Sequence, residues 1–307
     1  MDMSKSILLI GGNGYIGSRI YHDLNLKYNI KNIDLVWFGN NIDSEVKDFR
    51  HLPTKYLEKF DIILLFAGHS SVKMCDGPVL SCWNNNVNNF INLIKKIDKS
   101  QLLIYSSSGS VYGSNNLNSK EDFVLEFKPI NNYDLTKYTI DIEAKKFISE
   151  GYNIVGLRFG TVNGFSPNTR EELMLNSMIK SSIVNKKITI NNKTINRPIL
   201  GLNDLVYALE KIISNPIPGI YNLASFTDNV ENFSKYVSNY CGSSIIETVN
   251  VGNNYDFIMD TEKFTNTYNF QFNCSPISLI KEIIDNFDNI KFSNRNIFIN
   301  YEYNNWK

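Results

Sequence analysis

Two groups of polar side chains in the chain could move a proton. Tyr133 and Lys137 lie four residues apart in the segment YDLTK, which opens a helical pattern, so one turn brings both side chains to the same face. Tyrosine titrates near ~10, and a neighbouring ammonium favours its phenolate, which can accept a hydroxyl proton near neutral pH. Ser108 belongs to a second group, SSSGS, which follows an apolar run. Taken singly, the pair is also typical of a helix surface and the serines of a turn.

Three glycines near the N-terminus could hold a phosphate-containing cofactor. Gly11, Gly14 and Gly17 form GGNGYIG directly after the apolar segment SILLI. Glycines permit a tight turn and let the backbone approach a pyrophosphate, while the N-terminus of the following helix supplies free N–H groups. A glycine trio alone is a weak signal, but its position after an apolar strand favours dinucleotide binding.

Alternating strand and helix patterns must position these residues. Apolar runs predict strands at 6–10, 35–38, 62–67, 102–105 and 154–159, and helical periodicity appears at 15–26, 87–97 and 136–148. Right-handed crossovers between such strands place helices on both faces of one sheet. The sequence therefore predicts an α/β protein with a Rossmann-type, doubly wound parallel sheet.

After about Gly164 the regular alternation of strand and helix patterns ends in a more irregular stretch, which predicts a smaller C-terminal lobe. The pattern recovers as a strand at 220–223 and a helix at 278–287, and 197–213 reads as a strand followed by a helix that packs back on the first domain. We expect a dinucleotide-binding domain at 1–165, with 197–225 packing onto it. A substrate-binding lobe would then comprise 166–196 and 226–307.

Composition excludes several classes of partner. Lys plus Arg (31) equals Asp plus Glu (31), so no basic field exists for nucleic acid or an anionic membrane. No apolar stretch approaches the roughly 20 residues of a membrane helix, and no signal peptide is expected. The four cysteines lack metal-ligand or disulfide-scaffold spacing, which favours reduced thiols, no metal site and a cytoplasmic location: Cys75, Cys82, Cys241 and Cys274.

Taken in this order and at these distances, the glycine turn, the serine cluster and the YDLTK pair resemble the extended short-chain dehydrogenase/reductase family of nucleotide-sugar epimerases and dehydratases. The resemblance covers most of the chain, since FDIILLFAGHSSV, LRFGTVNG, RPILGLNDL, GIYNLAS and DFIMDTEKFTNTYNF are similar to later segments of that family. It implies that Tyr133 is the acid/base, that Lys137 activates it and binds the nicotinamide ribose, and that Ser108 hydrogen-bonds the reacting oxygen. It also implies hydride transfer between a sugar carbon and a nicotinamide.

The resemblance carries further roles to single residues. Asp48, with Phe49 beside it, matches an adenine-contacting aspartate, and Arg197 matches an arginine that binds the diphosphate of the sugar nucleotide. The cofactor would be contacted by Gly11, Gly14, Tyr15, Ile16, Gly17, Asn40, Asp48, Phe49, Ala67, Gly68 and Lys137. Substrate-side candidates are Ser110, Thr161, Asn176, Arg197 and His69, of which His69 is equally an ordinary loop histidine.

Departures from the family pattern narrow the expected reaction. Gly39 and Asn40 stand where the family usually ends its second strand with an acidic residue that binds the ribose, but no arginine replaces it, which favours NAD while leaving NADP open. Ser110 stands where dehydratases carry an acid and fucose-forming enzymes a cysteine, which disfavours both of those reactions. We expect an NAD-dependent oxidoreductase acting at C4 of a nucleotide-activated hexose or heptose, either a 4-epimerase or a 4-dehydrogenase.

Other interpretations remain open at this point. A reductase of a nucleotide 4-keto-sugar would use the same residues, and a non-catalytic dinucleotide-binding sensor would be expected to lose the Tyr133 and Lys137 pair. The resemblance also implies a homodimer or higher homo-oligomer formed through the helices near 87–97 and 136–148.

Overall fold

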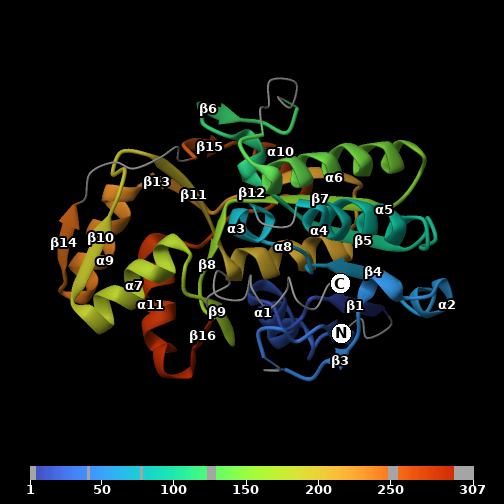
Figure 1. The fold of residues 1–307 in the computed structure, drawn as a ribbon, viewed down its shortest axis with the longest axis horizontal. Coiled ribbons are helices and arrows are strands. Elements are labelled where there is room, and N and C mark those ends of the chain that lie inside the picture. The colour runs from blue at the N-terminus through green and yellow to red at the C-terminus, as the bar shows by residue number, and fades with distance from the viewer. Residues whose placement is uncertain (1–4, 40–41, 77–78, 123–128, 248–254, 294–307) are drawn as a thin grey trace.

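The computed structural model describes residues 5–39, 42–76, 79–122, 129–247 and 255–293 (Figure 1). Its central feature is a seven-stranded sheet in which every neighbouring pair is parallel, in the order β12-β7-β5-β4-β1-β2-β3. The strands are β1 (Ser6–Ile10), β2 (Asn29–Asp34), β3 (Glu45–Val46), β4 (Ile62–Leu65), β5 (Leu102–Ser108), β7 (Ile154–Phe159) and β12 (Gly219–Leu223). The predicted fold class, an α/β protein with a doubly wound parallel sheet, is confirmed.

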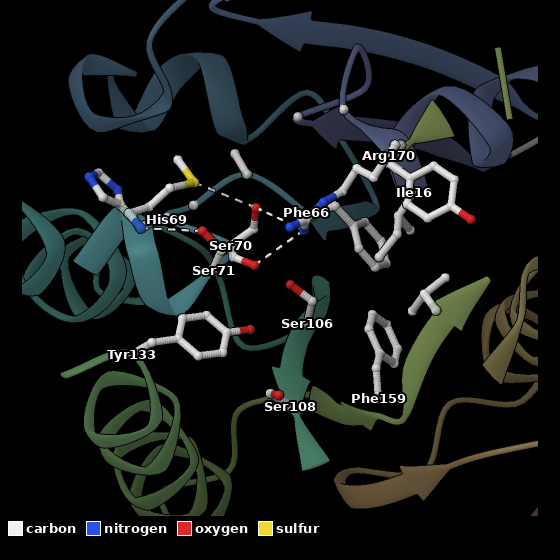
Figure 2. Close-up of a pocket in the computed structure, with 18 of the residues that line it drawn as sticks. Ile16, Phe66, His69, Ser70, Ser71, Ser106, Ser108, Tyr133, Phe159 and Arg170 are labelled. Carbon is white, nitrogen blue, oxygen red and sulfur yellow. Dashed lines mark hydrogen bonds between the residues drawn. The ribbon is translucent and has the colours of Figure 1, made fainter. Parts of the chain in front are cut away.

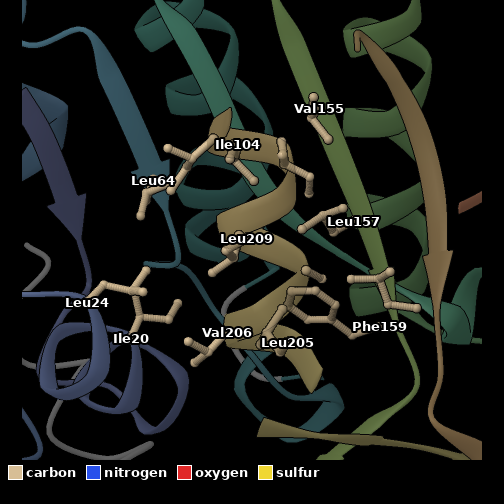
Figure 3. Close-up of a cluster of buried hydrophobic side chains, with 14 of the residues drawn as sticks. Ile20, Leu24, Leu64, Ile104, Val155, Leu157, Phe159, Leu205, Val206 and Leu209 are labelled. Carbon is tan, nitrogen blue, oxygen red and sulfur yellow. The ribbon is translucent and has the colours of Figure 1, made fainter. Parts of the chain in front are cut away.

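Alternate side chains of β1 explain why helices cover both faces of the sheet. Ile7 and Leu9 join a cluster with α1 (Tyr15–Leu24) and α8 (Leu202–Ser214), which Figure 3 shows around Leu209. Leu8 and Ile10 point to the opposite face and join a cluster with α5 (Asn89–Ile94) and α6 (Asn132–Ser149). Because successive strand residues face opposite sides, an uninterrupted apolar strand is buried by helices on both.

A smaller group of elements surrounds a separate apolar cluster, which contains Ile179, Phe233 and Ile280. Its helices are α7 (Met174–Asn185), α9 (Val230–Cys241) and α11 (Pro276–Asp285), and α10 (Glu262–Tyr268) packs against β12. Small sheets pair β10 (Lys187–Ile190) with β14 (Ser244–Glu247), β15 (Phe257–Met259) with β6 (Asn115–Ser119), and β16 (Lys291–Ser293) with β9 (Asn168–Arg170). β11 (Asn196–Gly201) lies between β13 (Phe226–Asn229) and β8 (Thr161–Asn163).

Short helical segments complete the described part of the chain. They are η1 (Phe49–His51), α2 (Thr54–Leu57), α3 (Val72–Asp76), α4 (Val79–Trp83), the π-helical η2 (Asn84–Asn88), η3 (Gly109–Tyr112) and η5 (Phe287–Asn289). No helix among the described residues is long and apolar enough to cross a membrane.

The second strand is where the sequence prediction is wrong. The run at 35–38 lies outside any strand, and β2 occupies Asn29–Asp34 instead. Only Ile30 and Ile33 of its segment NIKNID are apolar, and Asn29 and Lys31 are exposed, because this strand lies next to the short β3 at the edge of the sheet. A search for uninterrupted apolar runs therefore passes over β2 and selects the turn after it.

The cysteines also differ from expectation. Cys75 on α3 and Cys82 on α4 are both buried and form a disulfide, whereas the sequence spacing favoured reduced thiols. The two short helices pack against each other and bring residues seven positions apart together, with 5.1 Å between their Cα atoms. Cys241 and Cys274 are free.

Candidate functional site

A cavity of about 410 Å³ opens where β1, β4 and β5 end, at the carboxyl edge of the sheet (Figure 2). Ligands of doubly wound sheets bind at this edge, and the volume lies within the range of cofactor and ligand pockets. Most residues named from the sequence line this cavity: Gly11, Gly14, Tyr15, Ile16, Gly17, Asp48, Phe49, Ala67, Gly68, His69, Ser108, Ser110, Tyr133, Lys137, Thr161 and Arg197. Asn40 lies outside the described residues.

The glycine turn packs too tightly for a side chain at Gly11 or at Gly17. Gly11 has a φ of +92°, and a Cβ there would lie 2.6 Å from the backbone nitrogen of Ala67 on the neighbouring strand end. A Cβ on Gly17 would lie 2.2 Å from the carbonyl oxygen of Gly11. No side chain caps α1, and its first turn carries no acidic residue. The turn therefore leaves the helix N-terminus, with its free N–H groups, at the cavity wall.

Asp34 is a cavity residue that the sequence reasoning missed. It ends β2 and lines the cavity, and its two carboxylate oxygens accept hydrogen bonds from the backbone nitrogens of Asn13 (2.9 Å) and Val36 (2.7 Å). The expected loss of the acidic residue that ends the second strand is therefore wrong, because it followed from placing that strand at 35–38. The segment NIKNID has only Ile30 and Ile33 as apolar residues and no regular alternation, so hydrophobic periodicity gives no signal that could have found Asp34.

Asp48 is held in place by its own loop. Its side chain caps η1 through the backbone nitrogen of Arg50 and also accepts from the Arg50 guanidinium, with Nε 2.8 Å away. Burial alone would raise the pKa of Asp48, but the hydrogen bonds from Arg50 lower it overall. The lowered pKa keeps this carboxylate charged near neutral pH, and Phe49 beside it is buried at the cavity wall.

Tyr133 and Lys137 extend from the first two turns of α6 into the cavity. The Lys137 ammonium donates to the carbonyl oxygen of Ser106 (2.7 Å) and lies 5.9 Å from the centre of the Tyr133 ring. Burial lowers the pKa of Lys137 to about 8, partly opposed by the charge of Asp141 one turn further along α6. Burial raises the pKa of Tyr133, while a hydrogen bond with Ser108 and the charge of Arg170 act in the opposite direction.

The serine cluster lies at the cavity because β5 is longer than the sequence predicted. This strand continues through Ser106, Ser107 and Ser108 instead of ending at Tyr105, and all three serines line the cavity. The Ser108 hydroxyl donates to the Ser110 hydroxyl (2.9 Å) and accepts from the Ser110 backbone nitrogen (3.1 Å). Figure 2 shows the hydroxyl of Tyr133 directed into the cavity, near Ser106 and Ser108 on this strand.

Two arginines line the far side of the cavity. Arg197 on β11 lies with its guanidinium carbon 5.8 Å from the centre of the Tyr255 ring, and burial lowers its pKa. Among the described residues no carboxylate forms an ion pair with Arg197, although the charge of Asp256 acts on it, so an anionic ligand would meet a desolvated cation. Arg170 on β9, also missed from the sequence, pairs with Glu172 and reaches Ser70 across the cavity with Nη1.

Two predicted substrate residues lie differently from expectation. Asn176 is buried on α7 and does not line the cavity, because its amide donates to the Tyr15 hydroxyl (3.2 Å) and the Arg170 carbonyl (3.0 Å). His69 lies at the cavity wall but is 1% exposed, and its Nδ1 is hydrogen-bonded to Asn85 (3.0 Å). Burial lowers the pKa of His69 to about 4, so the ring is neutral at physiological pH.

The residues present fit a dinucleotide. The glycine turn leaves backbone at the cavity where side chains would collide, the uncapped α1 can accept a pyrophosphate, and Asp34 and Asp48 line the same cavity. No group of three His, Cys, Asp or Glu side chains in the described ranges could hold a metal ion.

Comparison with known proteins agrees with this geometry. The chain is 31% identical over 175 residues to a UDP-glucose 4-epimerase of Lactobacillus helveticus, which covers 52% of each chain. It is 28% identical to an ADP-L-glycero-D-manno-heptose-6-epimerase of Brachyspira hyodysenteriae over 74% of this chain and 77% of that one. Its fold matches a UDP-glucuronic acid 4-epimerase from Bacillus cereus, solved with UDP-glucuronic acid and NAD, at a TM-score of 0.81, with 19% identity over 92% of this chain and 99% of that one. A family model matches residues 7–224, and the chain belongs to the NAD dependent epimerase/dehydratase family.

Proposed function

We propose that this protein is an NAD-dependent nucleotide-sugar oxidoreductase that acts at C4 of the sugar, as a 4-epimerase or a 4-dehydrogenase. The observation that carries the proposal is that Tyr133, Lys137 and Ser108 come together in the same cavity as the glycine turn. The relatives and structural neighbours include UDP-glucose and UDP-glucuronic acid 4-epimerases, which supports the same reaction class.

The side chains of this cavity can each take one part of the reaction. Tyr133 accepts the proton of the sugar hydroxyl, and Ser108 hydrogen-bonds the same oxygen while it becomes a carbonyl. Lys137, fixed by the Ser106 carbonyl, holds a positive charge near the Tyr133 ring and favours the phenolate. NAD, when bound, supplies the acceptor for the hydride that leaves the sugar carbon.

The cofactor preference rests on Asp34. A carboxylate at the end of the second strand suits the two hydroxyl groups of an adenosine ribose and repels a 2′-phosphate. The backbone nitrogens of Asn13 and Val36 hold this carboxylate in a fixed position. Asp34 therefore favours NAD over NADP, in addition to the lack of an arginine at this position. Asp48 and Phe49 would contact the adenine, and Gly14, Tyr15 and Ile16 the pyrophosphate.

The substrate side is proposed to bind the nucleotide diphosphate through Arg197. This guanidinium is desolvated and its ring contact with Tyr255 fixes its orientation, so a bidentate phosphate contact needs little further ordering. Ser110 and Thr161 line the same cavity as Arg197 and the reacting residues and would contact the sugar.

The experiment that tests the function is a panel of UDP-, GDP-, dTDP- and CDP-sugars, followed by mass and by the absorbance of reduced cofactor. A product of unchanged mass means epimerase, and a product two hydrogens lighter with reduced cofactor means dehydrogenase. Turnover only of 4-keto-sugars with reduced cofactor would favour the reductase. Cofactor binding without turnover of any sugar nucleotide would contradict the proposal and favour a sensor.

Three further expectations belong to this proposal. The division into 1–165 with 197–225, and 166–196 with 226–307, is supported by the separate apolar cluster of the second group of helices. A homodimer through α5 and α6 is supported by Ile142, which is 45% exposed on α6, and sedimentation would test it. The cytoplasmic location stays a prediction, and the Cys75–Cys82 disulfide removes the thiol argument on which it was based.

A further inference from the structure

Buried hydrogen bonds attach the 163–170 segment, which runs from the end of β8 through β9, to the glycine turn. The Tyr15 hydroxyl donates to the carbonyl oxygen of Gly164 (2.8 Å) and accepts from the Asn176 amide (3.2 Å). The same Asn176 amide also donates to the carbonyl oxygen of Arg170 (3.0 Å). Tyr15 is 4% exposed and Asn176 0%, so a lost bond is not replaced by bulk water. These two side chains therefore connect both ends of the segment to the first residue of α1.

The backbone of the glycine turn accepts two further hydrogen bonds from the same segment. The Asn168 amide donates to the Asn13 carbonyl oxygen (2.7 Å), and the Ser166 hydroxyl donates to the Tyr15 carbonyl oxygen (2.7 Å). The Tyr15 carbonyl and the Ile16 N–H belong to one peptide group, at the helix N-terminus where the pyrophosphate is expected. Hydrogen bonds in a chain polarise one another, so an anion on the Ile16 N–H strengthens the bond from Ser166.

The far end of the segment carries a cation of the cavity wall. Figure 2 shows the Arg170 side chain extending to Ser70, with Nη1 3.3 Å from the Ser70 carbonyl oxygen and 3.4 Å from its hydroxyl. The backbone of Arg170 is held by Asn176. The position from which this guanidinium enters the cavity therefore depends on how well the 163–170 segment is ordered.

We propose that Tyr15 and Asn176 are positioning residues, which make the order of the 163–170 segment depend on the bound cofactor and thereby place Arg170 for the sugar nucleotide. When a pyrophosphate occupies the N-terminus of α1, the peptide groups of the glycine turn are fixed, and the hydrogen bonds of Tyr15 and Asn176 carry that restraint to the segment. Part of the ordering cost of Arg170 is then met before the sugar nucleotide binds. By linkage, a bound sugar nucleotide tightens the hold on the cofactor by the same factor.

The step to the sugar nucleotide rests on the proposed function, whereas the step from the cofactor to the segment does not. Asn176 touches neither the cavity nor the reacting residues, so it acts only through Tyr15 and Arg170. The two steps are therefore tested separately.

The first test needs only NAD. Hydrogen–deuterium exchange of the backbone N–H groups at 163–170 is measured without NAD and with enough NAD to saturate each protein, as checked by calorimetry. In the wild type we expect NAD to slow exchange in this segment about tenfold. Tyr15→Phe removes only the hydroxyl and Asn176→Leu keeps a side chain of similar size, and each should reduce the effect to about twofold, since a lost hydrogen bond is worth about fivefold.

The matched control is Tyr21→Phe on the same helix, because the Tyr21 hydroxyl has no hydrogen-bond partner among the residues that the structure describes. It should keep the wild-type response to NAD. An equal response in wild type, Tyr15→Phe and Asn176→Leu would overturn the proposal, and so would a wild-type segment whose exchange NAD leaves unchanged. The two variants break the connection at different bonds, so either one that folds decides the question.

The second test uses the sugar nucleotide that the wild type converts. Asn176→Leu should raise KM for it about fivefold and change kcat less, because Tyr133 and Lys137 keep their contacts. In an Arg170→Met background the same substitution should raise KM no further, since its effect passes through Arg170. The full fivefold increase in both backgrounds would refute that step. If no sugar nucleotide is turned over, the proposed function fails, while the exchange measurement still decides whether Tyr15 and Asn176 connect the cofactor site to the segment.

Discussion

Burial of the Lys137 ammonium leads to a prediction about stability. Its pKa falls from 10.5 in water to about 8 in the folded protein. Each unit is worth about 1.4 kcal/mol, so the charged form destabilises the fold by about 3 kcal/mol below the folded pKa. Between these two pKa values the unfolded state binds more protons than the folded state, so wild-type stability rises with pH across that window, and the penalty is gone above it.

Replacement of Lys137 by methionine removes this penalty and also the hydrogen bond to the Ser106 carbonyl, which is worth about 1 kcal/mol. We therefore expect Lys137→Met to be about 2 kcal/mol more stable than wild type near neutral pH, and to lose that gain as the pH rises through the window. Urea unfolding at about pH 7 and about pH 10 measures both values.

The control for this measurement is Lys146→Met on the same helix, because the Lys146 side chain is 65% exposed. Its unfolding free energy should change by no more than about 0.5 kcal/mol at either pH. The reasoning is refuted if Lys137→Met is no more stable than wild type near neutral pH, or if its gain is the same at both pH values.

Three further substitutions test the cavity. Asp34→Asn should weaken NAD binding about tenfold and reduce the preference for NAD over NADP, as measured by calorimetry. The control is Asp43→Asn, at an exposed position. Equal affinities of Asp34→Asn and wild type for NAD would contradict the ribose role. Gly17→Ala should lower the melting temperature and abolish NAD binding, because the new Cβ meets the Gly11 carbonyl at 2.2 Å, and retained binding would disprove the tight turn. Arg197→Met should raise KM for the sugar nucleotide tenfold or more while changing kcat less, since it removes a ground-state phosphate contact; an unchanged KM would exclude that contact.

The main sheet could be predicted because most of its strands are buried on both faces. The run at 154–159 matches β7, and the runs at 6–10 and 62–67 locate β1 and β4, because continuous apolar segments have few alternatives to a parallel strand. β2 has only two apolar residues, Ile30 and Ile33, so the same criterion misplaced it. Because the second strand was placed at 35–38, the sequence analysis missed Asp34, which is the strongest argument for NAD.

Only those residues of the candidate site that belong to sequence motifs could be predicted. The glycine turn, YDLTK and the serine cluster carry local signals, and the structure brings them to one cavity. Tyr255 lies in the segment before β15 and Arg170 on β9, and neither has a motif of its own. Their contacts depend on how this segment and β9 meet the rest of the cavity, which no local pattern encodes.

The cysteine prediction failed for a related reason. Spacing rules describe metal sites and known disulfide frameworks, and neither applies to Cys75 and Cys82. The two residues meet because α3 and α4 pack against each other, which is a tertiary contact between helices of five residues each. The prediction that Asn176 contacts the substrate was wrong for a different reason. This polar residue lies near a substrate loop, but it belongs to the buried hydrogen-bond network around Tyr15.

The measurement that tests the central claim most directly compares wild type and Tyr133→Phe after loading with NAD, using the sugar nucleotide that the wild type converts. Both proteins should bind NAD with the same affinity by calorimetry. Turnover of Tyr133→Phe should fall by about a hundredfold or more, because the hydroxyl that accepts the sugar proton is gone. Turnover equal to that of the wild type would contradict the account, since it would show that Tyr133 does not carry the proton transfer at this site.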